Sequence, residues 1–435
     1  MRLQGHTSKL IAAFVFVYVW TLTTHGKFSV SGDEPHYLIV AHSLAVDRDL
    51  DVANNYTNND ARLFGHDHLP MGRHASVDRF GQTESVHDIG LPVLLAVPYL
   101  AARSIADLVP PAWLSRFRMD RGLFTYSLIS LALAALTAWG VGLMASSVAV
   151  SPGSLAKACF VALVGISPPI ASHAFLIFPE VVALFLTAVV VWLVESRREV
   201  SSAALLWLFG ALGFLPWVHR KYSLYVLGLA FVIVWVRRDF TARLERSTKY
   251  LAGCCFVIPQ LALHGWTYFR WANLGGPQML SGVPFSASTW MTGLVGLWLD
   301  RQSGVLAYGP IYWLIVPCWI LTWRRTWPYV VPALLLYLPM AAFAEWWGGF
   351  SPAGRYLVPI IPLCAMAIVA ALERKSIQLL ALALAIPQIF IDAVVWQHPR
   401  LLWPVADAIN PALNSLGALG ASYGKLLPML RVGLD

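Results

Sequence analysis

The chain has 435 residues, of which 58% are hydrophobic and 12% are charged, whereas soluble domains carry about 25% charged residues. This composition excludes an ordinary soluble protein and predicts an integral membrane protein. The net charge of +8 does not indicate nucleic-acid binding, because the basic residues are spread over short segments between apolar stretches, as membrane topology requires.

Apolar segments recur along the whole chain, and several approach the roughly 20 residues that cross a bilayer. We therefore predict an all-α polytopic membrane protein with about 11 transmembrane helices. The first segment lacks a small-residue cleavage site after it, so we expect an uncleaved anchor. The predicted spans are 10–24, 122–145, 155–177, 181–194, 202–218, 222–236, 250–264, 304–322, 327–344, 356–372 and 376–396.

We expect residues 1–396 to form one transmembrane domain, with 27–121 as a large first external loop that contains juxtamembrane helices. Segment 89–103 would rise only about 22 Å as a helix, short of the ~30 Å hydrocarbon core, and is predicted to be interfacial or re-entrant. Residues 397–435 form a tail that could hold an interfacial helix or a final short span. All five cysteines lie in apolar segments and predict neither disulfides nor a zinc site.

The distribution of basic residues predicts the orientation in the membrane. With these spans, the basic clusters of the later loops, such as Arg197-Arg198, Arg324-Arg325 and Arg374-Lys375, fall on the cytoplasmic side. The polar motifs then gather on the opposite face. We therefore predict a multi-pass protein of the cytoplasmic (inner) membrane with one active site that faces the periplasm or exterior.

The first external loop opens with Gly32-Asp33-Glu34. Two adjacent carboxylates beside a bilayer are costly to leave uncompensated. Ser31-x-x-Glu34 followed by Pro35 also fits a helix N-terminus, with Ser31 as the cap and Glu34 closing a capping box. This structural interpretation explains Glu34 but not Asp33. Apolar residues then recur at helical spacing over 37–45, which predicts a helix of about three turns on the membrane surface, apolar side down.

The rest of this loop is rich in Asx and histidine residues. Asp47 to Asn55 is interpreted as Asx turns, with sugar contact as the alternative. His66, His68, His74 and His87 could supply metal ligands, but their spacing matches no specific metal site. We therefore assign no metal-binding residue and no cofactor, and whether the protein requires a divalent cation is left open. His87-Asp88 precedes the proline-broken segment 89–103 and could face a substrate.

Three further motifs fall on the same predicted face. Glu180 begins a span, where it could cap the helix or face the cavity as a second acidic group. His219-Arg220-Lys221 places cations against the positive-inside rule, which favours phosphate binding over contact with lipid headgroups. The glycine-rich segment 345–356 ends at Arg355-Tyr356, where Arg355 could hold a phosphate or a carboxylate. Arg301 is a weaker candidate of the same kind.

On these motifs the chain resembles the GT-C superfamily of polytopic glycosyltransferases and is similar to protein O-mannosyltransferases and lipid A aminoarabinose transferases. The resemblance covers roughly the first 200 residues and rests on Asp33-Glu34, the juxtamembrane helix, the segment from His87 to Pro92, and Glu180. It implies a GT-C-like bundle and an inverting transfer from a polyprenyl-phosphate sugar, with Asp33 as the catalytic Asp. Trp346-Trp347 is followed by Gly348, which departs from the Trp-Trp-Asp motif of oligosaccharyltransferases.

The chemistry of such a transfer fits these residue types. A carboxylate can accept the proton of the attacking hydroxyl, and cations can stabilise the leaving phosphate. We assign Asp33 as the base and Glu34 as its neighbour or as an acceptor-positioning group. The candidate substrate-binding residues are His87, Asp88, Glu180, His219, Arg220, Lys221, Arg301, Arg355 and Tyr356.

The expected partners are a polyprenyl-phosphate sugar donor, membrane lipids and an acceptor (glycan, lipid or protein) that the sequence does not identify. A transporter or flippase of a lipid-linked sugar is the alternative function. Transporters often show internal repeats and polar groups near the middle of the membrane. The chain has no obvious repeat, and its polar motifs collect at one face, which favours the enzyme.

Overall fold

The computed structural model describes residues 2–22, 32–148, 154–196, 199–277, 285–403 and 410–430. Ser31 and Arg197-Arg198, to which the sequence analysis gave roles, lie outside these residues. The described chain is almost entirely helical and has a single two-stranded sheet. The predicted all-α class is confirmed.

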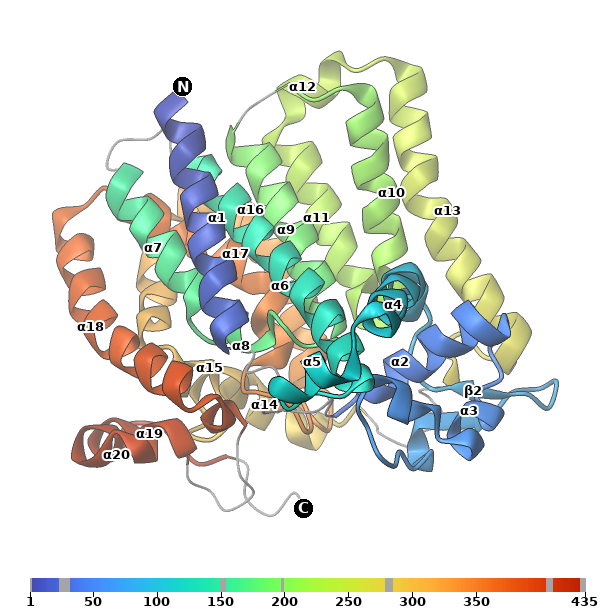
Figure 1. The fold of residues 1–435 in the computed structure, drawn as a ribbon. Coiled ribbons are helices and arrows are strands. Elements are labelled where there is room, and N and C mark those ends of the chain that lie inside the picture. Colours follow the sequence, from blue (N-terminus) through green and yellow to red (C-terminus); the bar gives the residue numbers. More distant parts are fainter. Residues whose placement is uncertain are drawn as a thin grey trace.

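Long helices pack side by side around a continuous apolar core. In Figure 1 they run in a common direction, with α1 against α6, α6 against α9, and α10 against α13. The bundle contains α1 (Arg2–Leu22), α6 (Arg121–Val148), α7 (Ser154–Ile166), α9 (Pro179–Ser196), α10 (Ser202–Val218), α11 (Ser223–Val236), α13 (Arg246–Trp271), α16 (Ile315–Ala341), α17 (Ile361–Ala371) and α18 (Lys375–Gln397).

Four helices within the described residues are long and apolar enough to cross a membrane. They are α6, α9, α18 and α4 (Gly90–Leu108), and further apolar helices of 10–17 residues, such as α7 and α10, accompany them. Helix length and composition therefore support a membrane protein, while the count of eleven spans stays a prediction.

Two predicted boundaries are wrong. Helix α16 continues through the predicted loop at Arg324-Arg325 and joins the segments predicted as separate spans. Arginine is a good helix former, so the basic pair does not end the helix, and the guanidinium of Arg325 lies 3.0 Å from the carboxylate of Glu195 at the end of α9. Helix α4 has 19 residues, about 28 Å of rise, so it is not too short to cross. Figure 1 nevertheless shows α4 nearly end-on, across the direction of α6 and α9.

The first loop folds into short elements at one end of the bundle. They are α2 (Glu34–His42), a π-helical turn (Ser43–Asp47), α3 (Ala53–Asn58), 3-10 turns (Asp60–Phe64 and Gly72–His74), the antiparallel strands β1 (Ala75–Val77) and β2 (Thr83–Ser85), and α5 (Pro111–Arg116). The strands pair with Ala75 opposite Ser85. Figure 1 shows α14 (Ala287–Leu299), α15 (Val305–Tyr308), α19 (Pro411–Ser415) and α20 (Gly417–Gly424) at the same end, whereas α12 (Arg238–Arg243) lies at the other.

Helix α2 forms where the sequence predicts it, but its surroundings differ from the prediction. Every residue of α2 is buried, because α4 and the turn Asp60–Phe64 pack against it, so it is not a surface helix with one apolar side. Asp33 occupies the N-cap position, and its carbonyl oxygen accepts hydrogen bonds from the backbone of His36 and Tyr37. The predicted capping box between Ser31 and Glu34 falls partly outside the described residues, because Ser31 is not among them.

Candidate active site

Four charged side chains form a continuous chain of ion pairs at the loop end of the bundle. Nη1 of Arg355 donates to Oδ2 of Asp33 at 2.9 Å, and its Nε donates to Oε1 of Glu180 at 3.1 Å. The same Glu180 oxygen accepts a hydrogen bond from Nζ of Lys221 at 2.5 Å. Positive and negative groups therefore alternate, and their formal charges cancel.

Each member comes from a different part of the fold. Asp33 caps α2, Glu180 lies in the first turn of α9, and Lys221 stands in a 3-10 turn (Arg220–Tyr222) between α10 and α11. Arg355 begins another 3-10 turn (Arg355–Ile360), directly after Gly354, whose φ of +78° suits glycine. The structure thus brings together four of the residues predicted from sequence.

Aromatic rings hold the two cations in place. The guanidinium carbon of Arg355 lies 4.0 Å from the centre of the Phe178 ring, and Nζ of Lys221 lies 4.8 Å from the centre of the Tyr356 ring. Within the part of the chain that is described, Nη2 of Arg355 makes no hydrogen bond, and neither does the buried Oε2 of Glu180. These two atoms therefore have no hydrogen-bond partner among the described residues.

Asp33 is the most accessible member, since its side chain is 27% exposed whereas that of Glu180 is 0% exposed. Burial alone would raise the pKa of Asp33, but Arg355 and then His87 outweigh this effect and hold the pKa well below its usual range. The position at the N-terminus of α2 also favours the ionised form. Asp33 is therefore a carboxylate at neutral pH.

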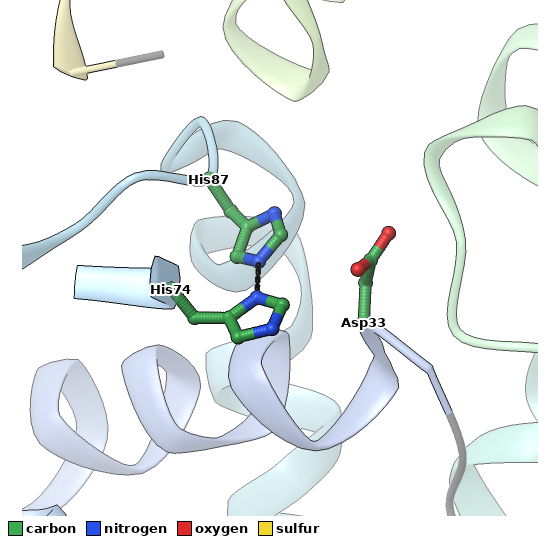
Figure 2. A group of neighbouring side chains, drawn as sticks. All are labelled: Asp33, His74 and His87. Atoms are coloured by element: carbon green, nitrogen blue, oxygen red, sulfur yellow. Dashed lines mark hydrogen bonds between the residues drawn. The ribbon is translucent and has the colours of Figure 1, made fainter. Parts of the chain in front are cut away.

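Two imidazoles face Asp33, as Figure 2 shows. Nδ1 of His74 and Nε2 of His87 are hydrogen-bonded at 3.0 Å. Burial lowers the pKa of His87 to about 4 despite the opposing charge of Asp33, so this imidazole is neutral at pH 7. One ligand atom from each of Asp33, His74 and His87 lies within 4.8 Å of the others, a spacing that could hold a metal ion.

Asp88 and Arg220 form a second pair beside this cluster. Nε of Arg220 donates to Oδ1 of Asp88 at 2.6 Å, and its backbone N–H donates to Oδ2 at 2.9 Å. Nη2 of Arg220 also donates to the hydroxyl of Thr267 at 3.1 Å, and Nδ1 of His219 lies 3.6 Å from Asp88. The predicted cationic triplet is therefore divided: Arg220 is bound to Asp88, while Lys221 is bound to Glu180.

Two predicted residues are not brought into the cluster. The buried carboxylate of Glu34 accepts hydrogen bonds from the Tyr126 hydroxyl at 3.0 Å and from the backbone of Ile177 at 2.8 Å, so it joins the first loop to the bundle. The guanidinium of Arg301 donates to the carbonyl of Leu427, at 3.2 Å from Nε and 2.9 Å from Nη2. Arg301 therefore ties down the C-terminal segment.

A pocket with an empty volume of about 540 Å³, which includes open solvent, lies in the same region, although neither Asp33 nor Arg355 lines it. Its wall is the loop after α16, and the carbonyl of Gly348 in that loop accepts a hydrogen bond from Arg355 at 3.4 Å. The same loop touches the start of α2, since a Cβ atom on Gly32 would lie 2.6 Å from the carbonyl oxygen of Phe350. The pocket is lined by Arg73, Glu345, Trp347, Gly349, Phe350, Ser351 and Trp403.

Sequence reasoning missed Arg73 and Trp403 as parts of this region, and it named His74 only among several possible metal ligands. No local pattern marks them, because their neighbours are distant in the sequence: Arg73 pairs with Glu345 at 3.0 Å across more than 270 positions. The wealth of histidines in the loop was the only available signal for His74, and it did not distinguish this residue from His66 or His68.

Comparison of the chain with known protein families, with curated proteins and with solved structures finds no match. The assignment of a function therefore depends on the geometry around Asp33 and on the resemblance of the sequence motifs.

Proposed function

We propose that the protein is an inverting glycosyltransferase that moves a sugar from a polyprenyl-phosphate donor to an acceptor hydroxyl at the outer face of the membrane. The observation that carries this proposal is the partly exposed, ionised Asp33, held by the buried Arg355 in the region of a pocket with two tryptophans. On this proposal the bundle is GT-C-like and belongs to the inner membrane.

Asp33 is the proposed base. One of its oxygens binds Arg355, and the other is left for the hydroxyl of the acceptor. A carboxylate with a low pKa is a weak base, but the acidity of a hydroxyl rises sharply as its oxygen bonds to the anomeric carbon. A late proton transfer to Asp33 is therefore favourable, and a positioned base of this kind contributes about 10²–10⁴-fold in rate.

Arg355 and Lys221 are the proposed phosphate ligands. Because both bind the same oxygen of Glu180, their charges stand next to each other and are fixed before the donor arrives. The unpaired Nη2 of Arg355 can donate to a phosphate oxygen, and cations placed there stabilise the charge that develops on the leaving group. Burial lowers the pKa of Lys221 to about 8, so it remains mostly protonated at pH 7.

The remaining predicted residues take supporting roles in this scheme. The unpaired Oε2 of Glu180 can accept a hydrogen bond from a sugar hydroxyl, which would remove the cost of about 1–3 kcal/mol of leaving a buried acceptor unsatisfied. Trp347 and Trp403 offer apolar faces to a sugar ring in the pocket. Asp88 and Arg220 hold the turn that presents Lys221. A divalent cation, if one is required, would be held by Asp33, His74 and His87.

The test is transfer of sugar from a synthetic polyprenyl-phosphate donor by the purified protein, its Asp33→Asn variant and a matched Asp67→Asn control. Asp67 lies in the same loop and is exposed, so its substitution removes the same charge away from the cluster. We expect the wild type and Asp67→Asn to consume the donor, and Asp33→Asn to lose at least about 10²-fold in kcat. Arg355→Ala should chiefly raise the KM for the donor.

Wild-type turnover retained in Asp33→Asn would show that Asp33 is not the base. Binding of the donor without consumption by any of the folded proteins would contradict the proposal as a whole. That second outcome would favour a transporter of the lipid-linked sugar.

A further inference from the structure

A second group of polar side chains lies at the far end of α2, away from Asp33. One ligand atom from each of His42, Asp47 and Asp60 lies within 4.8 Å of the others. The fourth member is Asn55, whose Nδ2 donates to Oδ2 of Asp47 at 2.6 Å and to Oδ2 of Asp60 at 3.0 Å. Two carboxylates therefore converge on one neutral amide.

The Asn55 carboxamide is fully buried, with 0% exposure, and it projects into this group. Its Oδ1 has no hydrogen-bond partner among the residues that the structure describes. A buried unsatisfied carbonyl is costly, and an amide can exchange its oxygen and nitrogen ends by turning about its last bond. Such a turn would break both hydrogen bonds of Nδ2 and direct the oxygen of Asn55 between the two carboxylates, an arrangement that only a bound cation would make favourable.

His42 is 4% exposed and contributes an imidazole from the last turn of α2. Its Nδ1 is hydrogen-bonded to the Tyr99 hydroxyl at 2.8 Å, and its Nε2 lies 3.8 Å from Oδ2 of Asp60, beyond hydrogen-bond distance. In the tautomer whose Nδ1–H donates to Tyr99, the lone pair of Nε2 faces Asp60, the orientation that metal-binding histidines adopt.

We propose that His42, Asp47, Asn55 and Asp60 bind one divalent transition-metal ion, of which Mn²⁺ is the representative. The donors are one imidazole nitrogen and several oxygens without sulfur, a set that suits Mn²⁺ or Zn²⁺ better than Ca²⁺, which prefers oxygen ligands alone. Bonds of about 2.2 Å place ligand atoms on one ion at most about 4.4 Å apart. The present spacing needs only a small closure to reach that geometry.

The position of the site defines its role. Asp47 ends the π-helical turn that follows α2, Asn55 lies in α3, and Asp60 begins the next 3-10 turn, so an ion here would join four consecutive elements of the first loop. It would clamp the C-terminal end of the helix whose N-cap is Asp33. This inference does not depend on the proposed function, because the ion would stabilise the loop whatever the protein catalyses.

The test is titration of Mn²⁺ into the purified full-length protein in detergent after treatment with a chelator, with free Mn²⁺ followed by electron paramagnetic resonance. Asp47→Asn is the first variant, since Asp47 is exposed and its substitution leaves the core intact. His42→Gln is the second. Asp67→Asn controls for the lost charge, and His74→Gln removes a ligand from the group around Asp33.

We expect one Mn²⁺ per chain in the wild type, in Asp67→Asn and in His74→Gln. Asp47→Asn and His42→Gln should weaken binding by at least about tenfold. At the same saturating concentration, Mn²⁺ should raise the thermal midpoint of the wild type more than those of both variants. Absence of binding in the wild type, unchanged affinity in both variants, or loss of binding through His74→Gln would each overturn the proposal.

Discussion

The buried carboxylate of Glu180 holds two cations at once, so replacing it by glutamine is a demanding test of the ion-pair chain. Its partners Lys221 and Arg355 have side-chain exposures of 3% and 7%, so neither can turn to water when Glu180 is neutralised. At about 3 Å and an effective dielectric constant of about 20, each contact contributes about 5 kcal/mol of attraction, which desolvation partly offsets. Removing one partner of a buried pair typically costs 3–5 kcal/mol.

We therefore expect Glu180→Gln to lower the free energy of unfolding by about 3–5 kcal/mol. The assay is denaturant unfolding in detergent micelles, followed by tryptophan fluorescence, for Glu180→Gln, Lys221→Met and the double variant. Glu180→Gln leaves the buried charges of Lys221 and Arg355 without their carboxylate partner, and Lys221→Met removes one of these two charges. The free energy of unfolding of the double variant should therefore fall by at least about 2 kcal/mol less than the sum of the losses in the single variants.

Arg325→Gln is the control, since the Arg325 side chain is 58% exposed in its pair with Glu195. Its loss should stay within about 1 kcal/mol, as for other surface pairs. Losses for Glu180→Gln as small as this, or strict additivity of the two single variants, would refute the description of a coupled buried network.

Further predictions concern the two neighbouring pairs. Gly276→Ala should lower the thermal midpoint more than Gly72→Ala, because both glycines have positive φ but only the Cβ at Gly276 would collide with the guanidinium of Arg220; equal losses would show that Arg220 is not held there. Since burial lowers the pKa of Lys221 from 10.5 to about 8, the unfolded chain keeps its proton to higher pH than the fold does. The shifted pKa of Lys221 therefore makes its full contribution to the free energy of unfolding above pH 10.5, where the amine is neutral in both states. This contribution is lost as the pH falls through 8, where the folded protein also takes up the proton. The thermal midpoint of the wild type should rise relative to that of Lys221→Met between pH 8 and 10.5, and parallel profiles would contradict this.

Much of the fold follows from the apolar segments, since a helix of lipid-facing residues satisfies its own backbone hydrogen bonds. The predicted loop at Arg324-Arg325 fails because arginine is a good helix former, so a basic pair does not by itself end a helix. Helix α2 was predicted correctly as a helix but not as a buried one, because its cover comes from α4 and from the turn at 60–64, whose packing no local pattern encodes.

In the candidate site too, the sequence predicts which residues matter but not how they pair. Unusual residues such as Asp33, Glu180 and Arg355 stand out because charged groups are rare in so apolar a chain. Their pairing does not stand out, and neither does the contrast between neighbours: Asp33 reaches Arg355, whereas Glu34 turns to the backbone of Ile177. The direction in which adjacent side chains point depends on the tertiary structure, and sequence reasoning alone gave both carboxylates the same site.

The long separations within the ion-pair chain have a consequence for biogenesis. Asp33 and Arg355 are 322 positions apart, and Arg355 and Glu180 are 175 positions apart. During synthesis the carboxylates are therefore made long before the arginine that neutralises them, and Glu180 first meets only Lys221. The site can reach its final charge balance only after most of the chain has been inserted, so nascent chains that stop before residue 355 should expose Asp33 without its counterion.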